Sequence, residues 1–182
     1  MNNPEPGNCC FILIDMQEKL QKAMSNVSKC IENQALLLKA AAILKIDSIV
    51  TEQYPEGLGN TIDELKCLLP ENTPIIEKTS FSCMGESKFR TALKSRSRKT
   101  LIVCGIEAHV CVQQTVLDLL AKDYEVIVAA DALTSRNIDN HQLALELMRQ
   151  AGAFITSSES IIFMLLRDAK HPNFREISKL IK

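Results

Sequence analysis

Three side chains that can take part in nucleophilic or proton-transfer chemistry follow apolar runs in this sequence. Asp15 comes directly after Phe-Ile-Leu-Ile, Lys78 follows Ile-Ile-Glu, and Cys111 lies six residues after Gly105. An aspartate in apolar surroundings can accept and return protons, and a cysteine thiolate is a strong nucleophile. A lysine beside them would hold both groups in position and favour their charged forms. These residue types indicate a candidate cysteine-dependent active site.

Each of these residues also has a structural interpretation. Asp15 would serve equally well as a turn residue at the end of a strand, and Lys78 as a solvated surface residue. Cys111 lies near the start of a predicted helix, where exposed N–H groups and the helix dipole favour a thiolate. Most free cysteines, however, are small buried core residues. The residues alone leave these alternatives open.

The histidines and glycines give no support for a metal or nucleotide site. His109 lies two residues before Cys111, but side chains at i and i+2 of a helix do not face each other, which disfavours a Cys–His dyad. His141 and His171 are expected to face solvent. The histidines have no metal-binding spacing, and Gly57-Leu-Gly lacks the third glycine of a dinucleotide fingerprint. We expect no metal and no other cofactor.

The composition describes one globular domain without a strong charge. The chain has 182 residues, near the roughly 150 of a single domain, and 46% of them are apolar. Lys and Arg total 21 and Asp and Glu total 22, which disfavours a protein that binds by neutralising many phosphates. The basic cluster at residues 94–99 could contact phosphates, although a solvated loop is the simpler interpretation. Nucleic acid is therefore not the expected partner.

Cysteine usage and the N-terminus indicate a cytoplasmic protein, with association with mitochondria or the nucleus left open. The seven cysteines are an odd number without a C-x-x-C pair, which favours reduced thiols over a disulfide framework. The N-terminus resembles neither a signal peptide nor a transit peptide, and the longest apolar tract, residues 35–46, is too short and too charged to span a bilayer. We expect residues 1–8 to form a tail and residues 9–182 to form one domain, with no membrane partner.

Six apolar runs of strand length alternate with segments of helical periodicity. The runs cover residues 9–14, 47–51, 75–77, 101–104, 124–129 and 153–156. Their continuous hydrophobicity is typical of strands covered on both faces. Leu143 and Leu147 mark the expected core face of one helix, and Thr156-Ser-Ser-Glu predicts a capping box at the start of the next. The sequence therefore predicts a three-layer α/β/α fold with a doubly wound, mostly parallel six-stranded sheet.

This fold would bring the chemical residues to one crevice. In an open parallel sheet, ligands bind beyond the carboxyl ends of the strands. Asp15, Lys78 and the segment 105–111 all follow predicted strand ends. The irregular segment 53–74 is long enough to shape a substrate pocket. We expect a small-molecule substrate in a pocket lined by Gln17, Tyr54 and Phe81.

Three motifs in the same order resemble those of the isochorismatase-like cysteine hydrolase family. They are Phe-Ile-Leu-Ile-Asp15-Met-Gln, Glu-Lys78-Thr-Ser-Phe and Cys-Gly-Ile-Glu-Ala-His-Val-Cys111-Val. The stretch Thr51-Glu-Gln-Tyr-Pro-Glu-Gly-Leu-Gly and the C-terminal stretch from His171 are similar to the eukaryotic isochorismatase domain-containing proteins. The likeness covers nearly all of the chain. It implies the isochorismatase-like hydrolase fold and, by family analogy, a homo-oligomer.

The resemblance implies a role for each matching residue. Asp15 would be the general base, Lys78 an orienting and charge-stabilising group, and Cys111 the nucleophile. In related amidases the peptide bond four residues before the cysteine is cis, which corresponds to the Ile106–Glu107 bond. The backbone N–H groups of Glu107 and Cys111 would then form an oxyanion hole. The implied reaction is hydrolysis of a small amide or a similar C–N substrate through a covalent intermediate.

The sequence departs from family patterns at two places. Nicotinamidases of this group carry an Asp-x-His-x-His metal site where this chain has Thr51-Glu-Gln-Tyr-Pro, so neither a metal nor that activity is implied. Many relatives have threonine where this chain has Ala108. Two other functions stay open. One is a binding or scaffold protein with little turnover, and the less favoured one is a nuclease-like protein that processes RNA.

Overall fold

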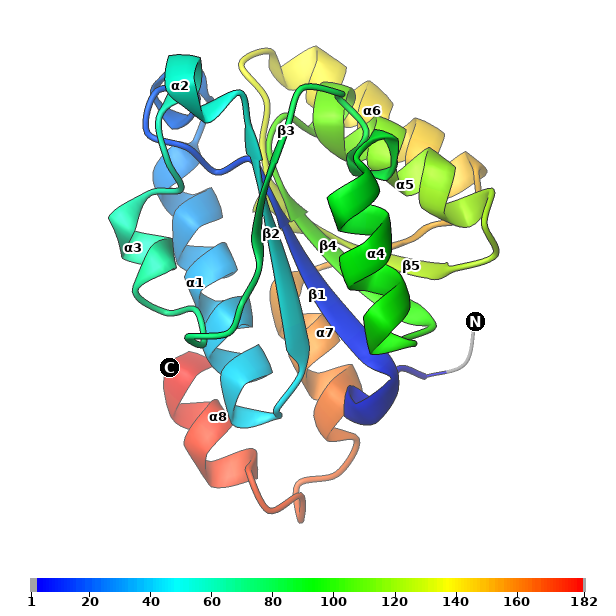
Figure 1. Ribbon diagram of the computed structural model, residues 1–182. Coiled ribbons are helices and arrows are strands. Elements are labelled where there is room, and N and C mark those ends of the chain that lie inside the picture. The colour runs from blue at the N-terminus through cyan, green and yellow to red at the C-terminus, as the bar shows by residue number, and fades with distance from the viewer. Residues whose placement is uncertain (1–2, 182) are drawn as a thin grey trace.

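A six-stranded parallel sheet forms the centre of the protein, as the computed structural model of residues 3–181 shows (Figure 1). The strands lie in the order β3-β2-β1-β4-β5-β6, and every neighbouring pair is parallel. Their bounds are β1 Cys9–Ile14, β2 Asp47–Gln53, β3 Ile75–Lys78, β4 Thr100–Gly105, β5 Glu125–Leu133 and β6 Phe154–Thr156. The doubly wound sheet predicted from the sequence is thus confirmed. Residues 1–2 of the expected tail and residue 182 lie outside the described residues.

Helices cover both faces of this sheet. They are α1 Val27–Ile43, α2 Pro55–Leu58, α3 Asp63–Lys66, α4 Ser87–Arg96, α5 Gln113–Leu120, α6 Ile138–Gln150, α7 Ser158–Leu166 and α8 Phe174–Ile181. α1, α7 and α8 pack together on one face, and α4, α5 and α6 lie on the other (Figure 1). The result is the predicted three-layer α/β/α architecture. None of the helices within residues 3–181 is long and apolar enough to cross a membrane.

Coverage on two faces explains the continuous apolar runs. All six residues of β1 are buried, because helices cover both sides of the central strands. β3 is an edge strand and alternates instead, with Ile76 and Lys78 buried and Ile75 and Glu77 exposed. Its alternation puts the Lys78 side chain on the covered face. The alternation of side chains along this edge strand therefore explains why a lysine is buried here.

Three expectations about helices were wrong. α6 buries His141, Ala144 and Met148, whereas Leu143 and Leu147 are 63% and 40% exposed. The small Ala144 side chain lets this face of α6 pack closely against α5 and the turn before it, so His141 is buried rather than solvated. At α7 the N-cap is Ser157 instead of Thr156, and its hydroxyl accepts the Ser160 N–H. Thr156 is still the last residue of β6.

Candidate functional site

The strand order changes direction between β1 and β4. β2 and β3 continue the sheet on one side of β1, and β5 and β6 on the far side of β4. At such a switch point the segments after the two strands separate and leave a crevice. Asp15 follows β1, and a π-helical turn with Cys111, η4 (Ala108–Val112), follows β4. Lys78 is the last residue of β3, so it also lies at the carboxyl ends of the strands.

Asp15 turns back toward the sheet directly after β1. Its φ of 53° is in the left-handed region, and its N–H donates to the Thr51 carbonyl at 3.0 Å. The side chain is fully buried. Oδ1 accepts a hydrogen bond from Thr51 Oγ1 at 2.7 Å, and Oδ2 accepts one from Lys78 Nζ at 2.7 Å. Each carboxylate oxygen is therefore held by one donor, and the carboxylate has one defined orientation.

The ammonium group of Lys78 is surrounded by acceptors. Its side chain has no exposed surface. Nζ lies 2.7 Å from both Asp15 Oδ2 and Gln53 Oε1, and 3.2 and 3.1 Å from the carbonyl oxygens of Ser80 and Phe81. A lysine has only three N–H groups, so these four acceptors use all of them. Lys78 therefore holds its neighbours in place and keeps no donor for a substrate.

Gly105 allows the chain to leave β4 close to β1. Its φ is 129°, and a Cβ at this position would lie 2.1 Å from the Ile14 carbonyl oxygen. The next residue, Ile106, donates its N–H to the same carbonyl at 2.9 Å. The Ile106–Glu107 peptide bond is cis, at the position that the family resemblance implies. η4 then leads into α5, and π-helical turns of this kind are frequent at functional sites.

A segment after β5 holds the loop that precedes Cys111. Each residue from 107 to 109 bonds to one residue of the segment 134–136. The bonds join Ala108 N to Thr134 O at 3.0 Å, His109 Nδ1 to Ser135 Oγ at 3.0 Å, and Arg136 N to Glu107 Oε2 at 3.0 Å. His109 thus pairs with a serine, in agreement with the expectation that it forms no dyad with the cysteine. Within residues 3–181 the Glu107 N–H donates to no acceptor.

Burial determines the protonation states of the site. Cys111 is only 6% exposed, and burial, followed by the charge of Asp15, raises the pKa of its thiol against the opposing charge of Lys78. Of the two alternatives left open by the sequence, a reactive thiolate and a buried cysteine, the raised pKa favours a protonated thiol at rest. Burial lowers the pKa of Lys78, but the charge of Asp15 and its hydrogen bond to the ammonium group act in the opposite direction, and the pKa is raised overall. The resting site holds a thiol beside a charged lysine.

Two site residues were missed at the sequence level. Thr51 donates to Asp15, and Gln53 lies between the site lysine and the cysteine, with its Oε1 4.0 Å from Cys111 Sγ. We expected the strand to end at residue 51, but β2 continues to Gln53. The signal that could have found both is the period of two in a strand, which puts residues 51 and 53 on one face. Both therefore face the crevice.

The three pocket candidates have different positions. Gln17 is fully buried and bonded to backbone, since its Oε1 accepts the Gln53 N–H and its Nε2 donates to the carbonyls of Gln53 and Gly59. It therefore fixes the loop instead of lining a pocket. Tyr54 is 52% exposed and lines a cavity of about 350 Å³ beside β3, whose lining includes neither Asp15 nor Cys111. Phe81 is 54% exposed and contributes its carbonyl oxygen to the lysine.

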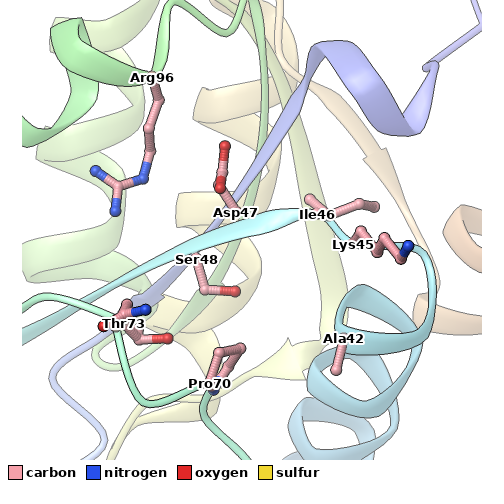
Figure 2. Close-up of a pocket in the computed structure, with 9 residues that line it drawn as sticks. Ala42, Lys45, Ile46, Asp47, Ser48, Pro70, Thr73 and Arg96 are labelled. Carbon is pink, nitrogen blue, oxygen red and sulfur yellow. The ribbon is translucent and has the colours of Figure 1, made fainter.

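A smaller cavity lies at the opposite ends of the strands, where β2 begins (Figure 2). It has a volume of about 200 Å³ and is lined by Lys45, Asp47, Ser48 and Arg96, among others. Asp47 begins β2, whereas the candidate site lies beyond its last residue. This cavity is therefore separate from the candidate site. Within residues 3–181, no three His, Cys, Asp or Glu side chains are arranged to hold a metal ion.

Comparison with known proteins assigns the family. The Isochorismatase domain profile matches residues 9–160. Isochorismatase domain-containing protein 2 of Danio rerio is 44% identical over 172 residues, which are 94% of this chain and 85% of that protein. The chain belongs to the isochorismatase family. The resemblance stated from the sequence is thus confirmed, including its narrower likeness to the eukaryotic isochorismatase domain-containing proteins.

Solved structures agree with the isochorismatase fold. A Caenorhabditis elegans structure described as MAR1 ribonuclease has a TM-score of 0.94 and 43% identity, and covers 99% of this chain and 92% of its own. The Escherichia coli YcaC gene product, described as an octameric hydrolase of unknown specificity, has a TM-score of 0.88 and 24% identity, with 97% and 95% of the two chains covered. The second likeness concerns the fold alone. Isochorismatase-like hydrolases therefore share this three-layer architecture.

Proposed function

We propose that this protein is a metal-independent cysteine hydrolase of a small amide or a similar C–N substrate. The observation that carries the proposal is the buried Asp15–Lys78 ion pair of 2.7 Å next to the thiol of Cys111. A thiol with a raised pKa needs a base before it can attack, and Asp15 is the acidic group that acts on it most strongly. Membership of the isochorismatase family supports the same chemistry.

The reaction begins with transfer of the Cys111 proton to Asp15. The sulfur then forms a bond to the carbonyl carbon, whose oxygen takes up the negative charge. Collapse of this intermediate breaks the C–N bond, and the leaving amine takes the proton from Asp15. A water molecule, activated by the same carboxylate, then hydrolyses the thioester and restores the thiol. Lys78 keeps Asp15 in one orientation throughout, because its N–H groups are all bonded within the site.

The backbone before the nucleophile is the proposed oxyanion hole. The Glu107 N–H is free of acceptors within residues 3–181 and lies four residues before Cys111, whose own N–H is the second proposed donor. Each donor of this kind contributes about 3 kcal/mol in the transition state. Residues 134–136 would keep the first donor in place through their three bonds to the loop. The hole would therefore be preorganised rather than formed on binding.

Alkylation kinetics test this assignment. We expect Cys111 to react with a small uncharged electrophile faster than Cys30, which is also buried and has its pKa raised to about 12, mainly by burial. Asp15→Asn should slow the reaction of Cys111 by about 100-fold or more, because the base is lost, and should leave Cys30 unchanged. Equal rates at the two thiols in the wild type, or no effect of Asp15→Asn, would contradict the proposal. A screen of small amides, with Cys111→Ser as the inactive control, would then identify the substrate.

A second candidate function is RNA processing, which the description of the Caenorhabditis elegans structure as a ribonuclease favours. The basic cluster at residues 94–99 lies before the first residue of β4, whereas the nucleophile follows the last residue of that strand. Its Arg98 is already bonded to Asp47 at 2.9 Å, and Arg96 lines the separate small cavity (Figure 2). A phosphodiester bound there would be far from Cys111. Retention of RNA on a filter, lost on raising the salt concentration, would favour this function over amide hydrolysis.

The protein is also proposed to form a homo-oligomer. Leu143 and Leu147 lie one turn apart on α6 and are both exposed. Exposed apolar side chains that lie together commonly mark contact surfaces. The octameric state in the description of the YcaC structure supports assembly of this fold through copies of one chain. The compartment proposed from the reduced cysteines is the cytoplasm.

A further inference from the structure

The side-chain amide of Gln53 has one defined orientation. Nε2 donates to the Thr79 carbonyl at 2.8 Å, and Oε1 accepts from Lys78 Nζ at 2.7 Å. A reversed amide would put its N–H groups against an ammonium and its oxygen against a carbonyl. The backbone is fixed as well, because the amide of Gln17 bonds both the N–H and the carbonyl of Gln53 at 2.7 and 3.0 Å. The oxygen of Gln53 therefore faces the reactive side of the site.

This oxygen still has acceptor capacity next to the nucleophile. A carbonyl oxygen accepts two hydrogen bonds, and Lys78 supplies one. The neighbour on the other side is Cys111 Sγ at 4.0 Å, a long contact to a weak donor. An N–H group of a molecule bound at the sulfur would be a stronger partner. Lys78 cannot accept this N–H group instead of Gln53, because its ammonium has only donors and all of them are used.

We propose that Gln53 Oε1 accepts a hydrogen bond from the N–H of the substrate's amide nitrogen and thereby selects amides that carry an N–H. This inference rests on the proposed function and names its substrate class. Primary and monosubstituted amides can donate this bond, whereas esters and disubstituted amides cannot. A site built around an acceptor discriminates against molecules that lack the matching donor, because the acceptor then loses a partner on binding. Gln53 acts as a specificity-determining residue beside the base, nucleophile and lysine.

Two acrylic amides provide a matched pair of probes. Acrylamide has two amide N–H groups, and N,N-dimethylacrylamide has none, while both react with thiols in the same way. The sulfur bonds to the terminal carbon, and the thiol proton ends on the carbon next to the carbonyl, so no further reactant is needed. Alkylation of Cys111 and of the exposed Cys67 is followed by peptide mass spectrometry. The rate at Cys67 in the same sample corrects for the intrinsic reactivity of each probe.

In the wild type we expect the corrected preference of Cys111 for acrylamide over the dimethyl compound to exceed that in Gln53→Leu by about 3- to 10-fold. This is the factor that one neutral hydrogen bond gives. The control Gln114→Leu changes the same residue type at an exposed position of α5 and should keep the wild-type preference. Gln53→Met, with an unbranched side chain of similar length, is the second variant if Gln53→Leu does not fold.

The outcomes separate this inference from the proposed function. A wild-type protein without the preference would overturn the inference. So would a folded Gln53 variant in which both probes slow by the same factor, because that result means that Gln53 only positions Lys78. If Asp15→Asn leaves alkylation of Cys111 by both probes unchanged, the proposed function itself fails. If Asp15→Asn slows both probes and only the preference is absent, the proposed function stands without this selectivity.

Discussion

Replacing Lys78 by methionine tests how the site holds a charge in the interior. The substitution keeps the length of the side chain and removes its ammonium. Asp15 would then be a buried carboxylate with one remaining side-chain donor, Thr51, at 2.7 Å. Breaking a fully buried ion pair by removing one partner costs about 3–5 kcal/mol, because the other charge stays buried without compensation. The carbonyl oxygens of Ser80 and Phe81 would lose their donor as well.

The measurement is urea unfolding of five proteins near neutral pH. We expect Lys78→Met to lower the free energy of unfolding by about 3–5 kcal/mol and Asp15→Asn to lower it as well. The double variant should be less destabilised than the sum of the two, because it buries no unpaired charge. The control is Lys29→Met, which removes an exposed pair with Glu32 at 3.1 Å and should have little effect.

The pH dependence gives an independent check of this pair. The pKa of Lys78 is raised in the folded state, so the protonated lysine binds its proton more tightly there than in the unfolded chain. The stabilisation is therefore complete below the ordinary lysine pKa of about 10.4 and is lost as the pH rises through the folded-state value. On the alkaline side, the difference in the free energy of unfolding between wild type and Lys78→Met should narrow in that range. Additive single effects, or a Lys78→Met cost similar to that of Lys29→Met, would refute the reasoning.

Three further predictions concern other parts of the molecule. Gly105→Ala should lower the free energy of unfolding by more than about 3 kcal/mol, because of its φ of 129° and a Cβ only 2.1 Å from the Ile14 carbonyl oxygen, and the urea midpoint measures this. In Asp15→Asn, which lacks the general base, the rate at which Cys111 reacts with iodoacetamide should rise steadily from about pH 7 to about pH 9. Burial raises the pKa of the thiol, so little thiolate is present at neutral pH. A rate that does not change with pH would contradict this. Leu143→Glu with Leu147→Glu should reduce the mass measured by sedimentation if α6 lies in the subunit interface, and an unchanged mass would exclude that face.

The presence of the strands could be predicted from the sequence, but the length of each strand could not. The buried central strands have continuous apolar runs, and β1 begins and ends where the sequence indicated, at Cys9 and Ile14. β2 is longer than its apolar run, because the last residues, Glu52 and Gln53, are polar and are held by hydrogen bonds instead. Hydrophobicity does not reveal a strand end that polar contacts stabilise. For that reason the site residue Gln53 was assigned to a loop.

Helix faces were harder to predict than strands. The Leu143–Leu147 spacing predicts a buried stripe, yet the packed stripe of α6 contains His141, Ala144 and Met148. Periodicity identifies the apolar positions of a helix, but the shape of the surface beneath decides which stripe fits against it. A small residue permits close approach, and a larger one on another stripe then remains exposed.

By itself, the sequence determined the alternation of strands and helices. It also placed an aspartate, a lysine and a cysteine after three strands. Both follow from the sequence because side-chain hydrophobicity and residue order are local properties. The tertiary structure alone decided that Asp15 and Lys78 lie 2.7 Å apart, and that Gln53 lies between that lysine and Cys111. It also decided that the thiol is protonated at rest, because burial and neighbouring charges arise only when distant segments pack together.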